Sequence, residues 1–242
     1  LHAREPNGEP TYKKEIYREM FTGVREECPE VLISGSCSGR LYGEFWQRSQ
    51  VLEVAPDLGS LTLGSLNFPK QASVNAPAMV QGLALAMKDR GIIPEMEIFD
   101  LGMADYARYL VDKQFIVGPL YANILLGSLG TLAATPDNLC AVVRGLPPGT
   151  TWAATGIGRF QFQVNTLAIA MGGHVRVGLE DAIYYDWDSK RLATNAGLID
   201  RVAKLAHAAG REIATADQMR KILGIGSAQP RADDRRPLAR AA

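Results

Sequence analysis

With 242 residues, of which 47% are hydrophobic and 21% charged, the chain has the composition of an ordinary globular protein that can bury a large core in one domain. Its 26 basic and 26 acidic residues cancel, so charge gives no indication of a nucleic-acid partner. No apolar run approaches the roughly 20 residues of a membrane helix. Three scattered cysteines, Cys28, Cys37 and Cys140, predict neither disulfides nor a thiolate zinc site and fit a cytoplasmic protein.

Strand and helix patterns alternate along the chain. We expect helices at 12–27, 77–90, 104–115, 135–146, 163–173 and 195–210, and strands at 31–39, 58–68, 94–100, 120–127, 151–159 and 174–186. Thr135 and Pro136 have the residue types of an N-cap and a first helical position. Periodicity stops after Gly226, so we expect a single domain of residues 1–226 and a disordered tail at 227–242.

The alternation of strand and helix with short connections predicts a parallel sheet. An open doubly wound sheet and a (β/α)8 barrel both meet this description, but barrel strands carry functional residues at their C-terminal ends. Polar residues near the expected strand ends therefore favour an α/β protein with a (β/α)8 TIM barrel: Ser36, Asn67, Asp100, Glu180 and Asp181. By this count the first strand, the first helix and most of the second strand are absent from the chain and would precede Leu1.

The expected strand 174–186 has an unusual pattern of charges. If it alternates, Arg176 and Glu180 share one face and point into the barrel, while Val175, Val177 and Leu179 face the helices. A buried arginine needs a carboxylate or a bound anion beside it, and Asp181 is the nearest carboxylate in sequence. From the pattern alone, a structural ion pair and a functional site are equally good interpretations.

Other candidate residues carry weaker signals. His2, at the end of an expected strand, could complete a metal site with an inward glutamate, but one histidine and one glutamate are weak evidence. His174 and His207 are interpreted as structural or surface residues. The stretch GIGRFQ (156–161) has half of a dinucleotide-binding pattern, and a tight turn explains it better than phosphate binding does.

Four stretches, GSLNF, PEMEIFD, WAATGIGR and GHVRVGLED, occur in an order and at separations that resemble the β-keto acid cleavage enzymes. The founding member of this family is 3-keto-5-aminohexanoate cleavage enzyme, and the resemblance runs from Leu1 to about Gly224. It implies a (β/α)8 barrel, a divalent metal that is usually zinc, a homotetramer, and no nucleic acid or membrane partner. It also implies a reaction in which a β-keto acid and acetyl-CoA give acetoacetate and a new CoA thioester.

The resemblance assigns roles to particular residues. His2 matches the second histidine of a metal-binding His-x-His motif, whose first histidine would come just before Leu1, and Glu180 matches the glutamate ligand. Arg176 and Asp181 match the catalytic arginine and aspartate. Ser36 matches a serine that holds the substrate carboxylate, Ser60 a hydroxyl residue of the pocket, and Glu97 a further pocket acid. A catalytic glutamate on the family's first strand has no counterpart.

These roles imply a mechanism. Zinc would polarise the ketone, and Asp181, held ionised by Arg176, would remove a proton from C2 of the substrate. Many relatives have Thr-Gly-Gly after the serine, where this chain has Cys37 and Ser38, so we expect a different side-chain preference in the substrate. Two alternatives remain: a metal-dependent aldolase or lyase that works without CoA, and a non-catalytic barrel remnant.

Overall fold

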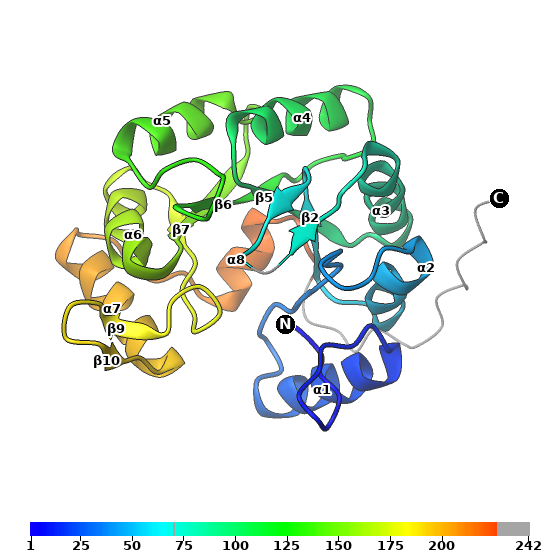
Figure 1. The fold of residues 1–242 in the computed structure, drawn as a ribbon, viewed down its shortest axis with the longest axis horizontal. Coiled ribbons are helices and arrows are strands. Elements are labelled where there is room, and N and C mark those ends of the chain that lie inside the picture. The colour runs from blue at the N-terminus through cyan, green and yellow to red at the C-terminus, as the bar shows by residue number, and fades with distance from the viewer. Residues whose placement is uncertain (70, 227–242) are drawn as a thin grey trace. The chain divides into compact units, whose positions relative to one another are not determined.

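The structure, a computed structural model, describes residues 1–69 and 71–226, and the predicted tail at 227–242 lies outside the described residues. Figure 1 shows the elements in chain order. The helices are α1 (Lys14–Glu27), α2 (Phe45–Arg48), α3 (Pro77–Arg90), α4 (Leu101–Asp112), α5 (Pro136–Gly145), α6 (Gln161–Ala170), α7 (Asn195–Ala208) and α8 (Ala216–Ile222), with the 3₁₀ helices η1 (Gln50–Val54) and η2 (Gly158–Phe160). No helix in the described ranges is long and apolar enough to cross a membrane.

The main sheet has the strand order β1-β2-β5-β6-β7-β8. These strands are β1 (Ser34–Gly35), β2 (Leu58–Thr62), β5 (Ile93–Ile98), β6 (Tyr121–Leu126), β7 (Thr151–Gly156) and β8 (His174–Val175). The pairs β1–β2 and β7–β8 are both parallel. Because neighbouring strands follow one another along the chain with helices between them, the sheet is built from βαβ connections, and the predicted α/β class is confirmed.

Two short antiparallel hairpins accompany the main sheet: β3 (Leu66–Asn67) with β4 (Ala72–Ser73), and β9 (Tyr184–Asp186) with β10 (Arg191–Leu192). Asn67 therefore lies in a hairpin, and the prediction that it ends a strand of the parallel sheet is wrong.

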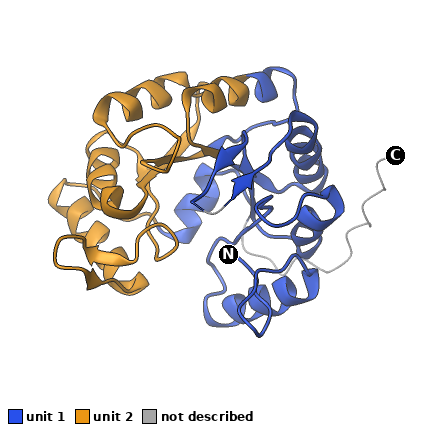
Figure 2. Ribbon diagram, in the orientation of Figure 1, with its two compact units in different colours: residues 1–96, 109–121, 215–242 blue, residues 97–108, 122–214 orange. Residues whose placement is uncertain are grey.

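The chain divides into two compact units, coloured separately in Figure 2. Unit 1 contains residues 1–96, 109–121 and 215–242, and unit 2 contains residues 97–108 and 122–214. The expectation of a single domain over residues 1–226 stays a prediction.

Helix formation follows the expected physics in both units. In α3, Val80, Leu83 and Met87 form the buried stripe that the helical spacing predicts. In α5, the Thr135 hydroxyl accepts a hydrogen bond from the Asn138 amide at 3.3 Å, and Pro136 occupies the first position, where the missing N–H costs nothing. The predicted start of this helix is confirmed.

The short helix α8, which belongs to unit 1, was not predicted from the sequence. Thr215 and Gln218 form a capping box at its start. Leu223, just after it, joins a buried cluster with Leu58 and Ile93. From α8, Arg220 forms a buried ion pair with Asp57, 3.1 Å apart, and the other Asp57 oxygen accepts from the Ile33 amide at 2.9 Å.

The strand expected at 174–186 is much shorter in the structure. It ends at Val175, because a turn follows in which the amides of Asp181 and Ala182 both donate to the carbonyl of Gly178 at 3.2 Å. The strict alternation beyond Val175 is therefore wrong, and Leu179, expected to face the helices, is 38% exposed.

Candidate active site

Arg176 in unit 2 is surrounded by three carboxylates. Its Nε and Nη2 donate to the two oxygens of Asp181 at 2.8 and 3.2 Å, which is the bidentate geometry that arginine and carboxylate favour. Its Nη2 also lies 3.1 Å from Glu180, and its Nη1 lies 3.6 Å from Glu97. The contact between Arg176 and Asp181 that the sequence indicated is confirmed, and Glu97, 79 positions before Arg176 in the chain, joins the same cluster.

Exposure differs strongly among these acids. The Asp181 side chain is 5% exposed and that of Glu97 18%, whereas Glu180 is 50% exposed. Burial acts to lower the pKa of the Arg176 guanidinium, but the charge and hydrogen bonds of Asp181, with the charges of Glu97 and Glu180, raise it above its ordinary value. The cluster therefore holds a charged arginine among three carboxylates.

Backbone contacts hold the turn that carries these acids. The amide of Gly158 donates to the carbonyl of Asp181 at 2.7 Å, and Gln161 Nε2 donates to the carbonyl of Gly178 at 3.2 Å. Buried Asn165 donates from Nδ2 to the carbonyls of Ala154 on β7 and of Arg176, each at 3.0 Å. The position of Asp181 therefore depends on the segment that follows β7.

The glycines of GIGRFQ serve this same segment. Gly158 has φ of +61°, in the left-handed region that favours glycine, and a Cβ on Gly156 would collide with the backbone of Phe160. The structure therefore supports the tight turn as the reason for these glycines.

A second group of predicted site residues gathers in unit 1. The Leu1 amino group donates to the carbonyl of Ser34 at 2.6 Å, and the amide of Ser36 donates to the carbonyl of Leu1 at 3.2 Å, which is the pattern of a parallel pair. His2 thus directly follows a segment that pairs with β1, and it is exposed. The hydroxyl of Ser60 accepts from the amide of Cys37 at 3.0 Å, so Ser36, directly after β1, lies near Ser60 in the middle of the neighbouring strand β2.

Two buried side chains support the loop after β1. Tyr17 of α1 donates from its hydroxyl to the carbonyl of Ser36 at 3.3 Å, and burial raises its pKa to about 12. Arg48 donates from Nε to the carbonyl of Cys37 at 2.8 Å and from Nη2 to Asn75 at 2.7 Å. The backbone around Cys37 is fixed from both sides, so its side chain has a defined place beside Ser36.

The implied metal can be compared with these donors. Histidine and glutamate are ligand types that zinc accepts, and catalytic zinc takes three protein ligands. The chain offers His2 in unit 1 and Glu180 in unit 2, and the described residues contain no group of three or more histidine, cysteine, aspartate or glutamate side chains that could hold a metal. The two donors, His2 and Glu180, match zinc in kind, but they are fewer than the three protein ligands of a catalytic zinc site.

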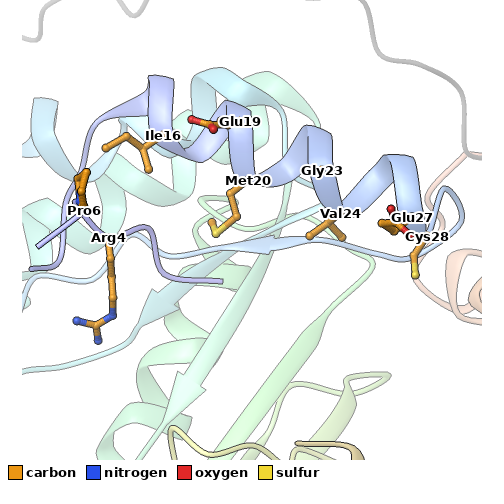
Figure 3. A pocket seen from close by; sticks show the side chains of 9 residues that line it. All are labelled: Arg4, Pro6, Ile16, Glu19, Met20, Gly23, Val24, Glu27 and Cys28. Carbon is orange, nitrogen blue, oxygen red and sulfur yellow. The ribbon is translucent and has the colours of Figure 1, made fainter. Parts of the chain in front are cut away.

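A hollow of about 830 Å³ lies beside α1 in unit 1 (Figure 3). Ile16, Met20 and Val24 project into it from one face of the helix, and Arg4 and Pro6 border it. None of the predicted site residues lines it.

One feature with possible chemistry was missed in the sequence. In the stretch YYDWDSKR (184–191), residues 184–186 are expected to end a long strand, but the stretch forms most of the hairpin β9–β10, whose aromatic rings border a pocket. The signal was the interleaving of aromatic and basic residues over a few positions.

The chain thus has a parallel α/β sheet with an arginine–aspartate pair just after its last strand, where α/β proteins commonly carry their functional residues. Comparison with known proteins identifies the class. The sequence model of the beta-keto acid cleavage enzyme family matches residues 1–225, and the chain belongs to this family.

Individual relatives agree with this assignment. The chain is 39% identical over 226 residues to the 3-keto-5-aminohexanoate cleavage enzyme of Fusobacterium nucleatum, covering 93% of this chain and 82% of the relative. It is 35% identical over 231 residues to the 3-oxoadipate:acetyl-CoA acetyltransferase of Cupriavidus necator, covering 94% and 80%. The prediction that the chain is an enzyme, an acyltransferase of this family, is confirmed.

Among solved structures, that of apo ObcA superimposes with a TM-score of 0.75 at 19% identity, and the match covers 90% of this chain. The chain spans little more than half, 56%, of that protein. At this identity the likeness concerns the fold, and it supports the α/β architecture described above.

Proposed function

We propose that this chain exchanges acyl groups between a β-keto acid and acetyl-CoA, giving acetoacetate and a new acyl-CoA. The observation that carries the proposal is the bidentate pair of Arg176 with the buried Asp181, with Glu97 beside it. Membership of the family supports the reaction class, and the names of two relatives specify a 3-keto acid in one case and 3-oxoadipate with acetyl-CoA in the other.

In this proposal Asp181 is the base. Protons on the carbon between the ketone and the carboxylate are the most acidic C–H bonds of a β-keto acid, so the reaction begins when Asp181 takes one of them. Arg176 fixes the carboxylate through two hydrogen bonds and favours its ionised form. A carboxylate has about four lone-pair positions, of which Arg176 takes two.

The remaining steps balance without an additional reactant. The C2 carbanion attacks the carbonyl carbon of acetyl-CoA, and the C–S bond breaks to release the CoA thiolate. The thiolate then attacks the original ketone carbon, and the bond between this carbon and C2 breaks. The new acyl-CoA leaves, and Asp181 returns its proton to C2 of acetoacetate.

Other predicted residues have positioning roles in this proposal. Ser36 and Ser60 would hold the substrate carboxylate and a second polar group, which restricts the substrate to productive orientations. Glu97, whose side chain is mostly buried, would help to keep Arg176 in place. Cys37 and Ser38 would contact the variable part of the substrate.

We also propose that a divalent metal, zinc in particular, takes part, with His2 and Glu180 as two of its ligands. When bound, such a metal would polarise the substrate ketone. A (β/α)8 barrel fold, a homotetramer and a cytoplasmic location belong to the same proposal, and light scattering after size-exclusion chromatography measures the assembly.

The test is an assay with doubly ¹³C-labelled acetyl-CoA and a panel of β-keto acids. The proposed reaction puts the label into C3 and C4 of acetoacetate, whereas an aldolase or lyase working without CoA yields unlabelled products that also form when acetyl-CoA is omitted. A folded protein with no turnover on any acid would favour the non-catalytic alternative and refute the proposal.

A further inference from the structure

A pocket of about 370 Å³ in unit 2 is bordered by aromatic rings and arginines. Its wall combines the start of α6, the hairpin β9–β10 and α7, which lie together in Figure 1. The lining includes Phe162, Tyr184, Tyr185, Trp187, Arg159 and Arg201. The size falls at the lower end of the range of small-molecule sites, about 300–1,000 Å³, so one nucleotide-sized group would fill it.

Arg201 is held rigidly at this pocket. Its guanidinium carbon lies 4.9 Å from the centre of the Phe162 ring and 4.5 Å from that of Tyr185, and Nη1 donates to the Tyr185 carbonyl at 2.6 Å. Its Nε is buried and has no hydrogen-bond partner among the described residues. An arginine stacked in this way presents its remaining donors in a fixed plane, which suits bidentate binding of a phosphate.

More positive charge surrounds the same place. Arg159, Lys190, Arg191 and Arg201 have no carboxylate within salt-bridge distance in the part of the chain that the structure describes. Burial lowers the pKa of Arg201, and the charge of Arg191 lowers it further. A bound anion would relieve this repulsion.

The negative charge at the pocket is smaller and partly engaged. Asp186 accepts hydrogen bonds from the amide and the hydroxyl of Ser189, at 2.7 and 2.6 Å, and Asp188 follows it in the hairpin. Among the lining residues Arg159 and Arg201 balance the two acids, and Lys190 and Arg191, which lie over the rings of Tyr184 and Tyr185, add positive charge beside the pocket.

Aromatic rings offer the complementary surface for a base. Trp187 is 38% exposed, and Lys190 Nζ lies 4.0 Å above its ring. Because a lysine ammonium sits on a flexible stem, a planar base could replace it on the ring and leave it free to contact phosphate. Stacking of a base on an aromatic side chain contributes about 1–3 kcal/mol.

We propose that this pocket binds the phosphorylated adenine nucleotide end of acetyl-CoA. The inference rests on the proposed function for the choice of this nucleotide. The pocket is joined to the acid–base pair, because Gly158 lines it and donates its amide to the carbonyl of Asp181. The pantetheine arm would run from the pocket toward Asp181.

The experiment titrates the whole chain with adenosine 3′,5′-bisphosphate, which has the nucleotide but no thiol, and follows tryptophan fluorescence and heat. We expect binding that competes with CoA and quenches Trp187, and a weaker response to inorganic phosphate. Arg201→Lys and Arg159→Gln should each weaken binding about tenfold and raise KM for acetyl-CoA by a similar factor, with kcat nearly unchanged.

The matched control is Lys204→Gln, which removes one positive charge from the same helix, α7, on an exposed side chain that pairs with Asp200 and lies outside the pocket. It should leave binding and KM as they are. Trp187→Phe should keep most of the affinity and lose most of the quenching.

The outcomes separate this inference from the proposed function. If acetyl-CoA is turned over but neither arginine variant changes KM or nucleotide binding, the pocket assignment is overturned and the reaction stands. If the nucleotide binds in an Arg201-dependent manner but no acyl exchange occurs, the reaction is wrong and the pocket stands. Equal affinity for phosphate and nucleotide would overturn the pocket as a nucleotide site.

Discussion

The replacement Asp181→Asn tests the assigned chemistry directly, because asparagine has nearly the same shape and only the charge and basicity are lost. In the native protein the carboxylate accepts two hydrogen bonds from Arg176 at 2.8 and 3.2 Å. Asparagine keeps one acceptor oxygen but directs an amide donor at the guanidinium, so one charge-assisted hydrogen bond is lost.

The cost to stability follows from this geometry. A hydrogen bond to a charged group contributes about 1.5–3 kcal/mol, and the variant also leaves Arg176 with two neighbouring carboxylates, Glu97 and Glu180, that partly offset the loss. We expect the free energy of unfolding to fall by about 1–2 kcal/mol, which a typical domain with about 5–15 kcal/mol tolerates. The protein should fold, and a change in rate will report on chemistry.

Loss of a general base lowers a rate by about 10²–10⁴-fold. The assay is formation of labelled acetoacetate under saturating acetyl-CoA, with urea unfolding of the same preparation as a check of folding. Glu97→Gln is the matched control: it removes a carboxylate from the same arginine at 3.6 Å and should reduce kcat less. If Asp181→Asn retained kcat within tenfold of the native value, Asp181 would not be the base.

Three further substitutions test other parts of the argument. Glu180→Gln should lower the amount of zinc bound per chain after dialysis, whereas Asp181→Asn should leave it unchanged, because only Glu180 is a predicted ligand. Equal losses of zinc in the two variants, measured by elemental analysis, would contradict these roles. Arg220→Met should lower the free energy of unfolding, measured in urea, by about 3–5 kcal/mol, because the buried carboxylate of Asp57 loses its partner. The double variant with Asp57→Asn should recover part of this loss of stability. Burial raises the pKa of Tyr17 to about 12, so the phenol ionises at lower pH in the unfolded chain than in the native protein. The free energy of unfolding should therefore fall as the pH rises from about 10 to 12, and Tyr17→Phe should remove this fall. If the free energy of unfolding of the variant fell with pH as steeply as that of the native protein, another group would be the cause.

Much of the fold could be predicted from local patterns. The stripe of Val80, Leu83 and Met87 and the cap at Thr135 each depend on residues within a few positions of one another, so their signals are visible in the sequence. The helix α8 could not be predicted, because seven residues carry little periodicity and the stabilising contacts of Arg220 and Leu223 are with residues at least 130 positions away.

The candidate site shows the same division. Alternation suggested that Arg176 and Glu180 share a face, and the contact is present, but it arises from a turn at Gly178 and not from strand pleating. The approach of Glu97 to Arg176 depends on the order of strands in the sheet, which period-two patterns do not encode. Only the resemblance to a family indicated that residue.

The amide of Gly158 links the turn after β7 to the carbonyl of Asp181, and the same glycine borders the nucleotide pocket. A side chain at this position would strain a backbone with φ of +61° and would point toward Trp187, 3.7 Å away. In a saturation mutagenesis screen, Gly158 should therefore accept asparagine and aspartate best, because their short side chains tolerate the left-handed region, and β-branched residues worst. One backbone position thus ties the shape of the co-substrate pocket to the placement of the proposed base, so replacements here should change KM for acetyl-CoA and kcat together.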